Sequence, residues 1–163
     1  MTNPFLPSIV LPAETIEHLI RLAKRSLESN DVPVAALLLY EGKVIGEGYN
    51  TVLRNSDAGG HAEINAISDA LRSLGVERFA ALDRSHLTLV STFEPCLMCI
   101  GACINHRIPT VHYLQPKTIA DLLKERKAEA MHFIRRRKVL DQGIQLELFR
   151  LHPDFKHQSG YSQ

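Results

Sequence analysis

Two kinds of hydrophobic spacing alternate along the chain, and they predict an alternation of helices and strands. Apolar residues three or four positions apart predict a helix over 13–29, with Arg and Lys on its other face. The continuous apolar run of 34–40 predicts a strand covered on both faces, and 44–49 predicts the strand that returns after a tight turn. Gly46 and Gly48 weaken this second strand, which fits a sheet edge or the close approach of another element.

The alternation continues beyond a polar loop at 50–60. The pattern predicts, in order, a helix from about His61 to Gly75, a connector at 76–85, a strand at 86–92, a helix at 96–105, a strand at 108–114, a helix at 118–138 and a strand at 144–149. This order predicts a three-layer α/β/α sandwich around a mixed five-stranded sheet. Because a helix joins the last two predicted strands, we expect them to be parallel.

The two ends of the chain lack a regular pattern. Residues 1–12 contain three prolines and predict an extended arm, whereas 152–163 predict either a disordered tail or a flap over a cavity. The basic run at 135–138 fits a solvated helix end, and a contact with a phosphate backbone is the alternative. No repeat or boundary divides the chain, so we expect one domain over 1–163.

Composition narrows the class of protein. The 163 residues are 45% hydrophobic and 23% charged, as in a globular domain, and the net charge of +1 neither requires nor excludes a nucleic acid partner. No apolar run reaches about 18 residues and no secretory leader is visible, so we expect no membrane span. Three cysteines favour a reducing compartment over a disulfide framework, and we expect a cytoplasmic protein.

Two short motifs carry the candidate chemistry, His61-Ala62-Glu63 and Glu94-Pro95-Cys96-Leu97-Met98-Cys99. A catalytic zinc ion keeps three protein ligands and leaves a fourth position for water, and one His with two Cys supplies three. The carboxylate two residues after the histidine would then transfer protons. A closed zinc site that only holds the fold is the alternative, but the remaining cysteine, Cys103, fits a small buried thiol better than a fourth ligand.

These motifs resemble the cytidine deaminase superfamily, in the branch of tRNA adenosine deaminases and nucleobase deaminases. The resemblance runs from about residue 32 to residue 114 and is carried by 31–34, 44–50, 61–66 and 94–102. It implies one zinc ion per subunit, held by His61, Cys96 and Cys99, with Glu63 as the proton shuttle. It also implies a homodimer.

The resemblance further implies that Asn50 and the backbone N–H of Ala62 contact the substrate, although a turn residue after an edge strand is an equal interpretation of Asn50. The tRNA branch usually has Asp-Pro-Thr-Ala before its His-Ala-Glu, whereas this chain has Asp57-Ala58-Gly59-Gly60. We therefore favour a hydrolytic deaminase of a free nucleobase or nucleoside of the guanine or cytosine type, which releases ammonia. The alternatives are a tRNA-specific adenosine deaminase acting on an anticodon adenosine and a non-catalytic RNA-binding partner subunit.

Overall fold

The computed structural model describes residues 11–118. The predictions for residues 1–10, for the helix at 118–138 apart from its first residue, for the strand at 144–149 and for the tail at 152–163 lie outside the described residues. The single domain over 1–163 stays a prediction. No helix in the described segment has the length and apolar character needed to cross a membrane.

A mixed sheet forms the centre of the described structure. Its strands lie in the order β2 (Lys43–Tyr49), β1 (Ala35–Tyr40), β3 (Leu87–Phe93) and β4 (Thr110–Gln115). β1 is antiparallel to both of its neighbours, and β3 and β4, the last two strands described, are parallel. The sheet has four strands in residues 11–118 rather than the predicted five, because the fifth was predicted at 144–149.

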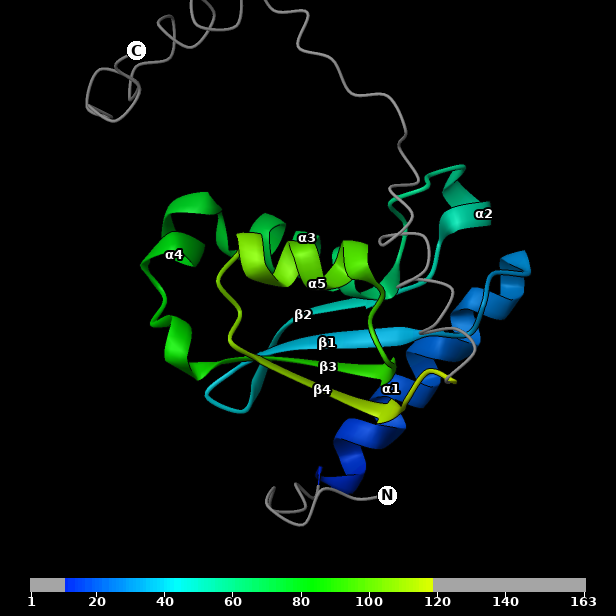
Figure 1. The fold of residues 1–163 in the computed structure, drawn as a ribbon, viewed down its shortest axis with the longest axis horizontal. Coiled ribbons are helices and arrows are strands. Elements are labelled where there is room, and N and C mark those ends of the chain that lie inside the picture. Colours follow the sequence, from blue (N-terminus) through cyan, green and yellow to red (C-terminus); the bar gives the residue numbers. More distant parts are fainter. Residues whose placement is uncertain (1–10, 119–163) are drawn as a thin grey trace, which may run out of the picture. The chain divides into compact units, whose positions relative to one another are not determined.

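Helices cover both faces of this sheet (Figure 1). α3 (Ala62–Leu74), α4 (Val76–Ala81) and α5 (Leu97–Asn105) lie on one face, and α1 (Ala13–Ser26) with the short η1 (Leu27–Ser29) lies on the other. Side chains of β1 alternate between the two faces, so both cores share this strand, and its first four residues are fully buried. The prediction of a strand covered on both faces is confirmed.

Two short helices were not predicted. The polar loop at 50–60 contains α2 (Val52–Asn55), and the connector at 76–85 contains α4 and the single 3₁₀ turn η2 (Arg84–His86). Elements of three to six residues complete less than two helical turns, so they show no hydrophobic period. α2 matters for function, because it forms part of the wall of the cavity described below.

The glycines of β2 set the distance between the sheet edge and α3. A Cβ atom on Gly48 would lie 2.3 Å from the backbone oxygen of Ala62, and one on Gly46 would lie 2.3 Å from that of Ala66. These oxygens belong to the backbone of α3 and could move away only if the helix itself moved, so only glycine allows this close approach. Both interpretations of these glycines are confirmed, since β2 is an edge of the described sheet and also packs tightly against a helix.

Candidate active site

The two sequence motifs meet because each begins a helix at the same end of the sheet. His61 has extended backbone angles (φ −76°, ψ 147°) and is the N-cap of α3. Cys96, which follows β3 after a short turn, is the N-cap of α5 with similar angles (φ −76°, ψ 171°). The metal-ligand candidates therefore lie at the positive ends of two helix dipoles.

The three candidate ligands form a compact triangle. Cys96 Sγ and Cys99 Sγ lie 3.5 Å apart, and each lies 3.6 Å from His61 Nδ1. A zinc ion with Zn–S bonds of about 2.3 Å and a Zn–N bond of about 2.0 Å separates its ligand atoms by about 3.5–3.8 Å at tetrahedral angles. The triangle therefore fits one zinc ion, and no fourth His or Cys joins the cluster within residues 11–118.

The protonation of the two thiols also fits a shared metal ion. Their mutual hydrogen bond lowers the pKa of Cys96 to about 5, assisted by the backbone N–H groups of Cys99 and Met98. The same hydrogen bond, together with burial, raises the pKa of Cys99 above its usual range. A cation that replaces the shared proton would hold both sulfurs as thiolates. Cys103 is buried in the core and lies outside the ligand cluster, as a small buried thiol should.

Glu63 brings a carboxylate to the same place. It lies in the first turn of α3 and is only 4% exposed, and its side chain lines the cavity beside His61 and Cys96. Its Oε2 accepts a hydrogen bond from the Cys99 thiol at 3.3 Å. One oxygen of the carboxylate therefore lies on the metal side of the cavity, where it can exchange protons with a bound molecule.

Asn50 and Ala62, the two predicted substrate contacts, are bonded to each other. The Ala62 N–H donates to Asn50 Oδ1 at 2.9 Å, and the Asn50 side chain lines the cavity. A ligand that takes the Ala62 N–H would compete with this bond. Substrate contact by either residue stays a prediction, and the bond gives Asn50 a structural role at the start of α3.

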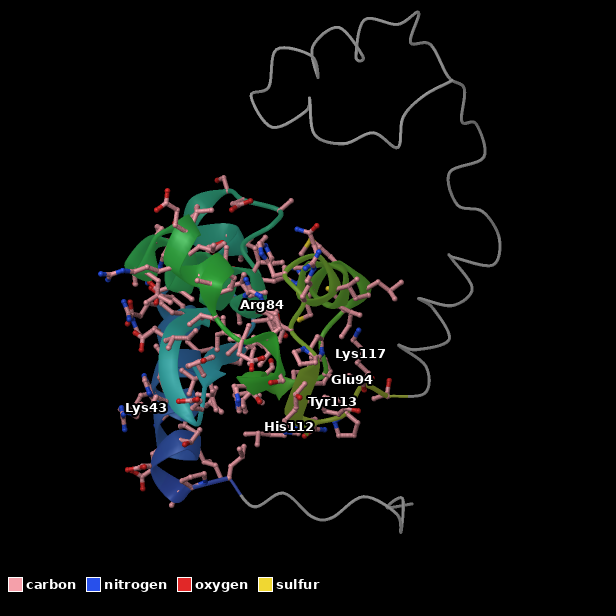
Figure 2. All side chains as sticks on the ribbon, turned by 90° about the vertical axis from the view of Figure 1, so that its left-hand side faces the viewer. Lys43, Arg84, Glu94, His112, Tyr113 and Lys117 are labelled. Carbon is pink, nitrogen blue, oxygen red and sulfur yellow. The ribbon has the colours of Figure 1, made fainter. Side chains whose placement is uncertain are left out.

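The cavity above these residues has a volume of about 430 Å³, within the usual range of small-ligand sites. Two exposed apolar side chains stand at its mouth, Val32 (66% exposed) and Leu53 (61% exposed). Glu94 and Lys117 also line the cavity. Glu94 Oε2 accepts the backbone N–H of Lys117 at 2.8 Å, and Lys117 Nζ donates to the backbone carbonyl of Pro95 at 3.2 Å. Figure 2 shows Glu94 and Lys117 beside one another, and their bonds tie the chain after β4 to the loop that carries Cys96.

The chain was compared with known families and proteins. Residues 12–115, well over half of the chain, match the cytidine and deoxycytidylate deaminase zinc-binding region. The chain belongs to this deaminase family. The expected zinc cofactor is thereby confirmed, and the family's zinc-binding region contains the whole ligand triangle.

The relatives of this chain are named for different substrates, which include tRNA and guanine. The tRNA-specific adenosine deaminase of Buchnera aphidicola subsp. Schizaphis graminum is 38% identical over 89 residues, which are 55% of this chain and 56% of that protein. A solved tRNA deaminase, studied for A-to-I editing at the wobble position of transfer RNA, is 33% identical with a TM-score of 0.57 over 64% of this chain and 76% of that one. The guanine deaminase of Bacillus subtilis, 24% identical, shares the fold with a TM-score of 0.66 over 94% and 99% of the two chains. The match spans 52–58% of the length of three bacterial tRNA-specific adenosine deaminases and 7% of the chloroplastic tRNA(adenine(34)) deaminase of Arabidopsis thaliana.

Two residues of this deaminase site were missed from the sequence. Ser91 in β3 contacts Glu63, and Asp31 supports the mouth of the cavity. Ser91 occupies the strand position two after Leu89, where alternation predicts another apolar residue, so its polarity was a signal. Asp31 lies in the segment 31–34 that contributes to the family resemblance, but its residue type alone also fits a solvated turn and did not indicate a bond to another loop.

Asp31, which is only 4% exposed, accepts three hydrogen bonds, and two of them hold α2. Its carboxylate accepts the backbone N–H groups of Leu53 (2.7 Å) and Arg54 (3.1 Å) and the Ser29 hydroxyl (2.7 Å). Burial alone would raise the pKa of this carboxyl, but the three donors outweigh it and hold the pKa below its ordinary 3.8. The ionised form therefore stabilises the cavity wall.

We expect Asp31→Asn to lower the urea midpoint of unfolding at pH 7, because the amide has no charge and its NH2 group cannot accept the bonds made to one of the two carboxylate oxygens. The ionised carboxylate contributes its stability above pH 3.8, and the contribution is lost as the pH falls through the lower folded pKa. The difference between the variant and the wild type should therefore narrow below pH 3.8. Asp57→Asn is the matched control, since exposed Asp57 makes a single local bond, to the Gly59 N–H. A difference that is the same at pH 7 and pH 3 would contradict the assignment.

Proposed function

We propose that this protein is a zinc-dependent hydrolytic deaminase and that its substrate is an adenosine in tRNA. The observation that carries the proposed activity is the meeting of the ligand triangle with the Glu63 carboxylate in one cavity. The sequence alone favoured a free nucleobase or nucleoside of the guanine or cytosine type. The tRNA-specific adenosine deaminases of Buchnera, 38% and 42% identical, and the solved tRNA deaminase, 33% identical, support the tRNA alternative instead. By family resemblance, we also propose that the chain pairs as a cytoplasmic homodimer.

The reaction replaces an exocyclic amine by oxygen. Water adds to the ring carbon that bears the amine, the bond from this carbon to nitrogen breaks, and ammonia leaves. Zinc, when it is bound by His61, Cys96 and Cys99, lowers the pKa of water to about 7 and so supplies the nucleophile near neutral pH. In this proposal the two thiolates and the imidazole hold the metal at the floor of the cavity.

Glu63 moves the protons that the reaction requires. Its Oε2 accepts a proton from the attacking water and delivers it to the ring nitrogen. It then accepts the second proton, from the hydroxyl now on the ring carbon, and delivers it to the amine, which departs as ammonia. Burial keeps solvent from the carboxylate, so the proton passes between enzyme and substrate. The Asn50 amide, which lines the cavity, would orient the base by hydrogen bonding.

The mouth of the cavity supports an unstacked base as the substrate. A base that is turned out of a single-stranded loop presents two apolar faces as well as its polar edge. Val32 and Leu53 offer exposed apolar contacts to such faces, while the polar groups lie deeper. The segment Asp57-Ala58-Gly59-Gly60, which differs from the usual tRNA-branch sequence, favours a second candidate, a free nucleobase or nucleoside of the guanine or cytosine type.

Ammonia release from a substrate panel tests the proposal. The panel contains a tRNA transcript with adenosine at the wobble position, the same transcript with guanosine there, and free adenosine, guanine, cytosine and cytidine. We expect ammonia from the first transcript alone, with inosine at the wobble position. Release from guanine, cytosine or cytidine, but from neither transcript, would instead support the second candidate, a free nucleobase or nucleoside. A zinc-loaded protein that releases ammonia from none of them would contradict the deaminase proposal and favour the non-catalytic partner subunit.

A further inference from the structure

A fully buried hydroxyl lies at the centre of the sheet, directly beneath the proposed proton shuttle. Ser91 is 0% exposed and belongs to β3, whose neighbours on either side are β1 and β4. Leu87 and Leu89 precede it on the same face of the strand, and both belong to the core under α3. A hydroxyl in this apolar row costs free energy unless it is hydrogen-bonded. Its partners therefore indicate what it does.

The hydroxyl proton of Ser91 is directed at Glu63. Ser91 Oγ lies 2.9 Å from Glu63 Oε1 and 3.4 Å from the Ala35 carbonyl oxygen. A hydroxyl has one proton to donate, and the nearer acceptor is also the carboxylate, so the bond to Glu63 is the stronger. The Phe93 N–H donates back to Ser91 Oγ at 3.4 Å, which uses an acceptor lone pair and leaves the proton for the carboxylate.

The two oxygens of Glu63 consequently have different surroundings. Oε1 is bonded to Ser91 on the sheet side, and Oε2 faces Cys99 on the metal side. A cysteine that binds zinc does so as a thiolate and has no proton to donate. Among the side chains of residues 11–118, Ser91 is then the remaining hydrogen-bond donor to this carboxylate.

We propose that Ser91 is a positioning residue for the deamination, acting through Glu63. Its hydroxyl fixes Oε1 to the rigid central strand, so that Oε2 points at the place where protons are exchanged. A glutamate side chain has three rotatable bonds, and an error of about 1 Å in a reacting group can cost about 100-fold in rate. This inference rests on the proposed function, because it assigns the support of the group that the mechanism uses.

The matched pair Ser91→Thr and Ser91→Val tests the inference, since the two new side chains share a shape and only threonine has a hydroxyl. We expect Ser91→Val to lower kcat about 10–100-fold with KM within about twofold of the wild type, because the lost interaction acts on the chemical step. Ser91→Thr should keep kcat within about threefold of the wild type. Ser91→Ala removes the hydroxyl without adding volume, and it should also lose kcat. Elemental analysis should find one zinc per chain in all three variants.

Crystal structures of the zinc-loaded variants supply a readout that needs no substrate. The Glu63 carboxylate should leave its wild-type position in Ser91→Ala and Ser91→Val and keep it in Ser91→Thr. The inference is overturned if the carboxylate stays in place in Ser91→Ala, or if Ser91→Ala deaminates at the wild-type rate. A wild-type protein that releases no ammonia from any substrate counts against the proposed function alone, since the carboxylate positions still decide the role of Ser91.

Discussion

Glu63→Gln should lose deamination while keeping its zinc. Glutamine has the size of glutamate and can accept the Ser91 hydroxyl bond, but its amide neither takes a proton from water nor delivers one to the leaving amine. General acid–base catalysis by one positioned group contributes about 10²–10⁴-fold, so we expect kcat to fall by that factor. Ammonia release measures the loss, and elemental analysis measures the zinc, which should remain at one per chain because Glu63 is outside the ligand triangle.

The matched control for this variant is Glu77→Gln. Glu77 also lies in the first turn of a helix, α4, but it is exposed and lines neither the cavity nor the ligand cluster. The Glu77→Gln variant should deaminate at the wild-type rate. A Glu63→Gln protein with full activity would remove Glu63 from the mechanism.

Cys96→Ala is expected to abolish zinc binding. It removes one of the three protein ligands, and the two that remain, His61 and Cys99, do not complete the set that a catalytic zinc ion keeps. Loss of a group that merely supports a ligand costs about 10–100-fold in metal affinity, so the loss of a ligand should exceed 100-fold. Elemental analysis after dialysis should find little zinc, and the wild-type Tm should fall on addition of a chelator while that of the variant should not.

Cys103→Ala separates metal binding from the packing of a cysteine. Cys103 lies in the same helix, α5, and is buried in the core, where burial raises the pKa of its thiol to about 11. Its removal should lower Tm through the lost packing and leave the zinc content unchanged. Full zinc retention in Cys96→Ala would refute the ligand assignment, as would zinc loss in Cys103→Ala.

The sequence predicted the ligand triangle because metal ligands impose fixed spacings on short segments. A Cys-x-x-Cys at the start of a helix places two sulfurs together, and only the third ligand, His61, comes from a distant segment of the chain. The described strands and the longer helices were also predicted within a few residues, since each is long enough to show a hydrophobic period or, for β1, a continuous apolar run. α2 and α4 were missed because four and six residues are too few for a period to be visible.

Contacts between distant residues could not be predicted in the same way. The bond between Ser91 and Glu63 joins residues 28 positions apart, and it depends on how β3 faces α3. The bond between Asp31 and Leu53 depends on the path of a loop. The preference for a free base rested on the unusual loop before His61. The relatives favour tRNA adenosine instead, and loop residues at a cavity mouth follow no spacing rule from which a substrate can be derived.

The catalytic groups and the residues at the cavity mouth lie on different parts of the structure, and this bears on how the substrate preference of the protein could change in evolution. The ligands His61, Cys96 and Cys99 lie at the N-terminal ends of packed helices. Val32 lies in a loop and Leu53 in the four-residue helix α2, and both are more than half exposed. Substitutions at these two exposed positions should change the free energy of unfolding little. They should also leave Glu63 and the metal ligands in place. A library that varies them offers an evolutionary route from one amine-bearing ring to another.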